Sequence, residues 1–354
     1  MKKSYTNFAR AVLFSLAFVP GNLLAQTTVF TEDFNRNENP FGTTGGTPAM
    51  TWTKVTTGQG NAVTQLVGGN NYQLAINNGA TSSVPATLGG RTYIFGSLAT
   101  FLSPFNTKLA SNTNDIIWTF NIRGARPYGD NGFGDTDNGY AVVLCATGQD
   151  FMTADGYAVT LKKGTSLNAV RLEKFTGGMG ANTNFTTVIG PSFDVATTNG
   201  YFSVKVIYTP STNTWKLYAR NDGTGPTDPN GGTTPLSQVG DATVESSLTN
   251  TTMSNFGFFV NISSTSWNSG NNKGNFDNFK VVVDNISTAV NTINTGQSLY
   301  VLNGRLVLSE GDVYDCSGKK VASVRDVKSQ NEIPLQRGIY FVKTLNGTTK
   351  VYMK

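Results

Sequence analysis

Histidine is absent from the 354 residues of the chain. Its absence excludes Ser-His-Asp and Cys-His catalysis, histidine general bases and zinc held by imidazole. The chain has only two cysteines, Cys145 and Cys316, which are too few for a four-thiolate zinc site. Both lie in strand-like runs, which predicts two unpaired core thiols rather than a disulfide. Calcium held by oxygen ligands is the metal chemistry that remains.

Charged residues are also scarce, at 14% of the chain, and the net charge of +5 is unevenly spread. Residues 1–25 contribute +3, residues 26–286 carry 15 basic and 17 acidic side chains, and residues 287–354 carry nine basic and five acidic ones. The large middle part is therefore nearly neutral, and its basic residues do not form the stripe that phosphate binding uses. We expect no nucleic-acid partner.

Long apolar runs are missing as well, because the longest one, residues 11–19, falls short of the roughly 20 residues that span a bilayer. Two lysines and an arginine precede this run, and a small residue, Ala25, stands just before Gln26. This pattern predicts a signal peptide over residues 1–25, and hence an exported mature protein with no transmembrane segment.

The rest of the chain is rich in short β-type runs separated by Gly, Asn, Thr, Asp and Pro. No amphipathic helical window of normal length follows the signal peptide, so the pattern predicts an all-β protein built from sandwiches or jelly rolls. Two similar runs, 139–144 and 156–161, are expected to be adjacent strands of one sheet. The predicted strands cover residues 27–33, 51–55, 72–76, 92–95, 116–123, 140–145, 157–161, 170–175, 202–208, 214–219, 256–262 and 276–283.

Three segments of residues 26–286 carry a family resemblance: residues 32–35, the hairpin of residues 202–219, and residues 275–281. Together they resemble the concanavalin A-like or laminin G-like jelly rolls of exported bacterial surface proteins. The resemblance implies a jelly-roll domain over 26–286 whose first and last strands lie side by side. It also implies a calcium site near those paired strands, formed by Glu32, Asp33, Asp277 and Asp284. The alternative is that these are surface acids or a capped strand end.

The last part of the chain predicts a small β-domain over residues 298–354, after a linker over residues 287–297. Asn303-Gly304, Ser317-Gly318 and Asn346-Gly347 each separate two alternating apolar runs, which is typical of β-hairpins. The order of motifs at 313–321, 337–343 and 350–354 resembles the C-terminal sorting domain of the type IX secretion system. That resemblance implies a small immunoglobulin-like sandwich recognised by the outer-membrane secretion machinery. Its sorting signal would include Gly338, Tyr340, Lys350 and Lys354, and the alternative is an ordinary immunoglobulin-like accessory domain.

Residues 130–139 are the densest group of oxygen ligands in the sequence, and they precede a predicted strand. Asp130, Asp135 and Asp137 are candidate calcium ligands, since alternate carboxylates can face one ion. Tyr128, Asp135 and Asp137 are candidate sugar contacts. The alternative is a solvated turn in which Asp, Asn and Gly stabilise tight backbone geometry.

Sugars stack on exposed aromatic faces, so the four tryptophans are sorted by whether each is expected to be exposed. Trp118 and Trp215 lie on alternating strands and are predicted to be core residues, whereas Trp52 is ambiguous. Trp267 stands alone in the wholly polar stretch of residues 263–272. It is the first candidate ligand contact, with Asn271 beside it, unless it folds back onto the core.

Glycoside hydrolysis needs two carboxylates flanking the scissile bond, and no strand carries the alternate acids that jelly-roll hydrolases use. Glu173 stands alone on its predicted strand, and Glu245 lies in the polar run of residues 242–247. The sequence therefore predicts an exported or cell-surface non-catalytic protein that binds a glycan or another surface ligand. Two alternatives stay open: a histidine-independent glycoside hydrolase or polysaccharide lyase, and a structural adhesin without a small-molecule ligand.

Overall fold

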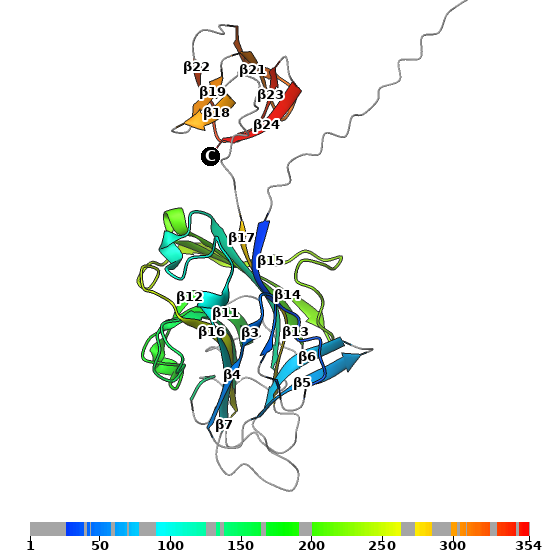
Figure 1. Ribbon diagram of the computed structural model, residues 1–354, viewed down its shortest axis with the longest axis vertical. Coiled ribbons are helices and arrows are strands. Elements are labelled where there is room, and N and C mark those ends of the chain that lie inside the picture. The colour runs from blue at the N-terminus through cyan, green and yellow to red at the C-terminus, as the bar shows by residue number, and fades with distance from the viewer. Residues whose placement is uncertain are drawn as a thin grey trace, which may run out of the picture.

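A computed structural model shows a nearly all-β protein whose strands form two groups, with no strand pairing between the groups among the described residues (Figure 1). The structure describes residues 26–38, 41–42, 44–57, 61–68, 71–77, 90–124, 132–134, 138–163, 168–190, 200–262, 273–284, 299–302, 305–308, 310–325, 331–344 and 347–353. Within these ranges no helix is long and apolar enough to cross a membrane.

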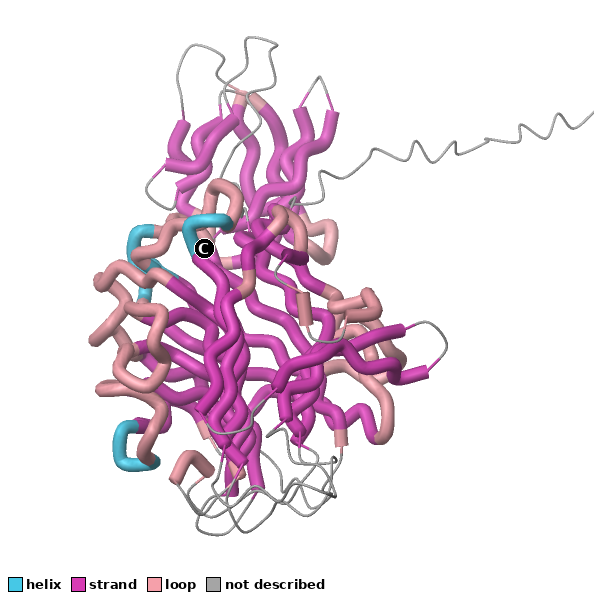
Figure 2. Tube along the Cα trace, turned by 60° about the horizontal axis from the view of Figure 1, so that its bottom comes forward, coloured by secondary structure: helices cyan, strands magenta, loops and turns pink. Residues whose placement is uncertain are grey.

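The larger group is a two-sheet sandwich of the jelly-roll type (Figure 2). One sheet has eight strands: β15 (Ser237–Val244), β14 (Thr214–Gly223), β13 (Tyr201–Thr209), β8 (Asp115–Gly124), β17 (Lys273–Asp284), β6 (Asn71–Asn77) and β5 (Asn61–Gly68) in spatial order, with β1 (Gln26–Glu32) also paired to β17. The other has seven: β12 (Phe185–Ile189), β11 (Asn168–Phe175), β10 (Gly156–Lys163), β9 (Gly139–Ala146), β16 (Asn255–Ile262), β7 (Gly90–Ser97) and β4 (Thr53–Thr57). The minor elements are β2 (Thr44–Gly45), β3 (Met50–Thr51) and the 3-10 turns η1 (Leu98–Thr100), η2 (Leu109–Ser111), η3 (Asn182–Asn184) and η4 (Pro210–Thr212).

The main core lies between the two sheets and follows from alternation along the strands. On β13, Phe202, Val204 and Val206 are fully buried in the core, while the residues between them face away from it. Trp118 and Trp215 are fully buried and stack with ring centroids 6.0 Å apart, which confirms their predicted core role. Trp52, which the sequence left ambiguous, is also buried.

A second apolar layer covers the outer face of the seven-stranded sheet. Phe259 and Tyr93 stack there at 5.6 Å, and Phe151 and Phe133 pack over them from connecting segments. As a result every residue of β9 and of β16 is buried. Burial on both faces explains why their sequences read as continuous apolar runs rather than as alternating ones.

Strand neighbours agree with the sequence at two important places. β1 and β17 pair antiparallel, so the first and last strands of the large sandwich lie side by side as predicted. β9 and β10, the strands with similar sequences, are also antiparallel neighbours. The predicted all-β class is confirmed, and so is a sandwich followed by a smaller one.

The smaller group is a seven-stranded sandwich whose core includes Leu306, Val313, Tyr340 and Val342. Its sheets have the orders β18-β19-β22 and β21-β20-β23-β24, from β18 (Leu299–Leu302), β19 (Arg305–Leu308), β20 (Gly311–Asp315), β21 (Lys320–Val324), β22 (Asn331–Pro334), β23 (Gly338–Thr344) and β24 (Gly347–Met353). The three predicted hairpins are present, although the last one pairs Thr344 with Gly347, which places Gly347 in the strand instead of the turn.

Cys316 is exposed, so the prediction that it is a core thiol is wrong. β20 ends one residue earlier because the Asp315 carboxylate accepts hydrogen bonds from the backbone amides of Ser317 and Lys319, which turns the chain there. Both cysteines are unpaired, as predicted, and Cys145 is buried, which raises its thiol pKa to about 12.

Candidate functional site

Three connections cross between the two sheets at one end of the large sandwich, which we call the crossing end. Residues 78–89 join β6 to β7, residues 125–138 join β8 to β9, and residues 263–272 join β16 to β17. Strand register places the ends to which they are attached side by side, because Asn261 near the end of β16 pairs with Gly139 at the start of β9, and Gly274 pairs with Gly124. In Figure 1 this end of the strands points away from the start of β1 and the end of β17.

Residues 132–134, a described stretch of the second connection, are fastened to the sheet by two side chains. The Asn261 amide donates to the carbonyl oxygens of Gly132 at 3.1 Å and Gly134 at 2.8 Å. Arg91 donates to the Asn261 side-chain oxygen at 3.2 Å and to the Phe133 carbonyl at 3.4 Å. These bonds fix the backbone of the segment that leads into β9.

Two glycines let this segment lie flat on the sheet. A Cβ on Gly139 would come within 2.2 Å of the Gly132 carbonyl oxygen, and one on Gly132 would meet the Lys162 side chain at 2.5 Å. Gly132 also has φ +68, a conformation that L-residues with side chains rarely adopt. The close approach therefore requires glycine at both positions.

Beside this segment lies a buried ion pair between Lys162 and Glu173, with Nζ and Oε1 2.9 Å apart. Thr160 donates a hydrogen bond to Glu173 at 2.7 Å, and the Lys162 ammonium lies 4.7 Å from the centre of the Phe185 ring. Phe185 in turn stacks on Phe133 at 4.7 Å. The pair thus ties the outer face of the sheet to the segment at 132–134.

The predicted ligand contacts Tyr128, Asp135, Asp137, Trp267 and Asn271, together with the candidate calcium ligand Asp130, lie outside the described residues. Their points of attachment are described, and these stand next to each other at the crossing end. Trp267 and Asn271 belong to the connection that follows β16, while the others belong to the connection that precedes β9. Both connections therefore leave the sheets at neighbouring strand ends.

The two acidic residues considered above for glycoside hydrolysis lie apart, and each is bonded to neighbouring side chains. Glu173 is buried on the outer face of the seven-stranded sheet, where Lys162 neutralises it. Glu245 follows β15 and accepts hydrogen bonds from Tyr157, Ser247 and Lys174. Tyr157 belongs to the core on the inner face of β10, so these two carboxylates do not flank one space.

Three acidic residues, Glu32, Asp33 and Asp277, lie near one another where β1 ends beside β17. Asp277 is buried, its Oδ1 accepts a hydrogen bond from the Asn278 amide at 2.8 Å, and its Oδ2 has no hydrogen-bond partner. Burial, followed by repulsion from Asp33 and Glu32, raises the pKa of Asp277 to about 7. The charged form of Asp277 is therefore destabilised in the fold.

The predicted calcium set of Glu32, Asp33, Asp277 and Asp284 is not assembled. Glu32 pairs in register with Phe279, whereas Asp284 pairs with Gln26 at the other end of β1. Five residues along β17 separate the two positions by about 16 Å. Among the described residues no group of three or more acidic or cysteine side chains is arranged to hold a metal ion. The described residues therefore do not fit the calcium site that the resemblance implied.

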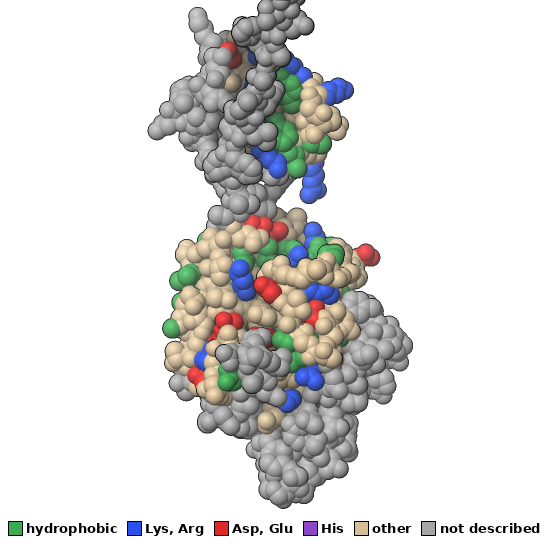
Figure 3. All heavy atoms as spheres, turned by 90° about the vertical axis from the view of Figure 1, so that its right-hand side faces the viewer, with side chains coloured by type: hydrophobic (Ala, Val, Ile, Leu, Met, Phe, Trp, Pro, Cys, Tyr) green, Lys and Arg blue, Asp and Glu red, His purple; other side chains and the backbone are tan. Residues whose placement is uncertain are grey.

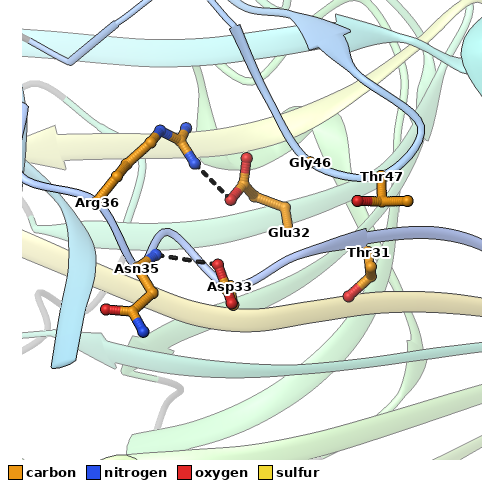
Figure 4. Close-up of a pocket in the computed structure, with 7 residues that line it drawn as sticks. All are labelled: Thr31, Glu32, Asp33, Asn35, Arg36, Gly46 and Thr47. Atoms are coloured by element: carbon orange, nitrogen blue, oxygen red, sulfur yellow. Dashed lines mark hydrogen bonds and ion pairs between the residues drawn. The ribbon is translucent and has the colours of Figure 1, made fainter.

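One oxygen of Glu32 has two protein partners. Glu32 Oε1 accepts from the Arg36 guanidinium at 2.6 Å and from the Phe34 amide at 2.8 Å. Figure 4 shows this ion pair among residues that line a pocket. The volume of the pocket is about 270 Å³. The wall of this pocket is formed by Thr31, Glu32, Asp33, Asn35, Arg36, Gly46 and Thr47.

Of the predicted sorting residues, Gly338, Tyr340 and Lys350 fall on paired strands, and Lys354 lies outside the described residues. Gly338 pairs with Met353, and Tyr340 pairs with Val351. Tyr340 is buried in the core of the small sandwich, and its hydroxyl donates to the Gln336 carbonyl at 3.0 Å. Lys350 is exposed on β24 opposite Phe341.

Two residues that anchor the segment at 132–134 were not singled out from the sequence, namely Asn261 and Arg91. Asn261 is a polar residue inside the apolar run of residues 256–262, and this was the cue that could have marked it. A buried amide in such a run must find hydrogen-bond partners. Nothing in the sequence around Arg91 distinguishes it from a surface arginine.

No protein-family model and no curated protein sequence matches the chain. Basic winged bean lectin with Tn-antigen is similar in structure, with 9% identity, a TM-score of 0.39, and coverage of 73% of this chain and 98% of the lectin. A lectin from Bauhinia forficata in complex with GalNAc has 11% identity and a TM-score of 0.39, over 74% of this chain and 100% of the lectin. A GH131 β-glucanase catalytic domain from Podospora anserina has 10% identity and a TM-score of 0.34, over 63% and 78%. These similarities are too low to give any residue of this chain a role.

Proposed function

We propose that the protein is exported and binds carbohydrate through the connections at the crossing end of its large sandwich. One observation carries this proposal: the two polar segments that hold the candidate ligand contacts are attached at paired strand ends, Asn261 opposite Gly139. Asn261 and Arg91 also fix the backbone that leads from one segment into the sheet. A rigid sheet that presents adjacent polar loops is a common arrangement for ligand binding.

Removal of the Trp267 indole should weaken glycan binding by at least about tenfold, since one stacked aromatic at the centre of a site is worth more than about 1.4 kcal/mol. The measurement is screening of the full mature chain on a glycan array, followed by calorimetric titration of Trp267→Ala with the best glycan. Leu102→Ala is the matched control, because Leu102 is 48% exposed beside η1, at the opposite end of the sandwich. If the unmodified chain binds no plant, host or microbial glycan, the proposal fails.

We also propose that residues 298–354 direct the protein to the outer cell surface through the type IX secretion machinery. The support is the order of motifs together with a complete small sandwich in which β23 and β24 pair from Gly338 to Met353. Binding and addressing would then belong to separate groups of strands.

Deletion of residues 338–354 removes β23 and β24, and with them the buried residues Tyr340, Val342 and Val351. The truncated protein should be retained in the periplasm of a bacterium that has a type IX pathway. Cell fractionation and surface proteolysis measure this directly. Delivery of the truncated protein to the surface at the normal level would contradict the addressing role.

A further inference from the structure

Exposed apolar side chains are concentrated on one sheet of the small sandwich. Among the described residues five large hydrophobic side chains are exposed, and three of them, Val321, Ile339 and Phe341, belong to the sheet β21-β20-β23-β24. Their exposed fractions are 42%, 37% and 36%. Single exposed hydrophobics are normal on protein surfaces, but their grouping on so small a sheet is not.

Alternation along β23 separates its two faces. Tyr340 and Val342 point into the core, so Ile339, Phe341 and Lys343 belong to the opposite face. Phe341 pairs directly with Tyr314 on β20, which places two aromatic residues next to each other on this outer face. Figure 3 shows hydrophobic side chains exposed on the small unit between lysines and arginines.

The charges around this face are mainly positive. Lys343 is exposed and pairs in register with Asp312. Asp312 is bridged by Lys320 at 3.1 Å and by Arg325 at 2.7 Å, and these two cations remain 46% and 61% exposed. Two cations thus bridge the carboxylate of Asp312, and with Lys343 they give this described part of the rim a net positive charge.

From this combination we propose that the outer face of β20 and β23, centred on Tyr314, Ile339 and Phe341, docks a protein surface with an apolar centre and an acidic rim. An aromatic centre with a polar rim is the usual anatomy of a protein interface. A second copy of this chain would bring Lys343, Lys320 and Arg325 against their own equivalents, and like charges across an interface are unfavourable. A membrane is disfavoured because the apolar residues lie on paired strands of a sheet rather than on an amphipathic helix.

This docking surface rests on the proposed addressing role, whose partner it defines by chemistry. Of the predicted sorting residues, Lys350 lies opposite Phe341 on this face, whereas Tyr340 is buried and cannot contact a partner directly.

The test uses the full chain in a bacterium with a type IX pathway, with the photo-crosslinking residue benzoylphenylalanine in place of Phe341. The matched control carries it in place of Val244, which is 68% exposed on the large sandwich. We expect position 341, and not position 244, to crosslink one protein whose labelled peptide contains acidic residues. Lys343→Glu should reduce the crosslink at least about tenfold, and a lysine at the labelled acid of the partner should restore it. Lys108→Glu, which reverses another exposed lysine, should change nothing.

Other outcomes overturn the docking surface: no crosslink from position 341, crosslinks only to lipid or to a second copy, or a crosslink indifferent to Lys343→Glu. Cell fractionation of the same cultures separates this result from the addressing role. If the chain reaches the surface only when residues 338–354 are present but position 341 crosslinks nothing, addressing stands and the docking surface fails. If the charge-dependent crosslink forms while the truncated chain is still exported, docking stands and addressing fails.

Discussion

Lys162→Met is expected to lower the free energy of unfolding of the large sandwich by about 3–5 kcal/mol, the usual cost of leaving a buried charge without its partner. The side chains of Lys162 and Glu173 are only 8% and 1% exposed, so water cannot replace the lost ammonium. Hydroxyl donors from Thr160 and Thr187 would remain, but they carry no charge to balance the carboxylate. Methionine keeps most of the volume of the lysine stem that packs under Gly132.

Urea unfolding followed by tryptophan fluorescence measures this effect selectively, because all four tryptophans lie in residues 26–286. Lys174→Met is the matched control: Lys174 neighbours Glu173 in the chain but bridges Glu245 at 3.3 Å in a more exposed position, with side chains 20% and 16% exposed. A much smaller loss is expected there. The double variant Lys162→Met/Glu173→Leu should recover most of the stability, since an apolar replacement of a buried pair is often neutral. Equal losses for Lys162→Met and Lys174→Met would show that burial of the pair is not what matters.

Alternation and turn residues were enough to predict most of the framework. β13 and β14 bury alternate residues along an antiparallel pair, and the sequence predicted both strands and their hairpin. The adjacency of β1 and β17 followed from a family resemblance and not from periodicity, and the structure agrees. These features depend on local pattern or on a shared topology, which a sequence can carry.

β15 and β12 were missed for a physical reason. β15 is an edge strand in which only Val239 is buried, so no apolar alternation marks it. β12 is an edge strand of the other sheet, with buried residues only at Val188 and Ile189. Strands that bury one or two side chains look like polar loops in sequence.

Of the candidate site, the sequence predicted the polar loops but not the residues that anchor them or the strand pairing that positions them. The sequence showed that residues 130–139 and 263–272 are polar, but the attachment of these segments at neighbouring strand ends depends on the pairing of Asn261 with Gly139. The anchoring bonds of Asn261 and Arg91 join residues 127 to 129 and 42 positions apart, respectively, and no local pattern encodes them. The same limit explains why Asp284 was grouped with Glu32 although strand register separates them.

Asp277→Asn is expected to raise the free energy of unfolding at pH 8 by up to about 4 kcal/mol and to change little near pH 4. Burial, with the nearby charges of Asp33 and Glu32, raises the folded-state pKa of Asp277 to about 7. An aspartate in an unfolded chain titrates near 3.9, so the protonated acid favours the folded state, and its stabilisation is lost as the pH rises from about 4 through 7. A difference of about three pKa units corresponds to about 4 kcal/mol. Asparagine removes the ionisation, and its side-chain oxygen can still accept the bond from the Asn278 amide.

The measurement is urea unfolding of both proteins by tryptophan fluorescence between pH 4 and pH 8, in EDTA. Asp33→Asn is a useful comparison, because Asp33 is exposed and repels Asp277, while an asparagine oxygen can still accept the bond from the Asn35 amide; it should give a smaller gain with the same sign. A variant at position 277 that is less stable than the wild type at pH 8 would contradict the electrostatic account. A second series with calcium in place of EDTA makes the distinction sharper. A cation bound by the Asp277 carboxylate would stabilise the wild type alone, so calcium would then reverse the order of stability of the two proteins. If the order is unchanged by calcium, repulsion and burial are sufficient to explain the raised pKa of Asp277.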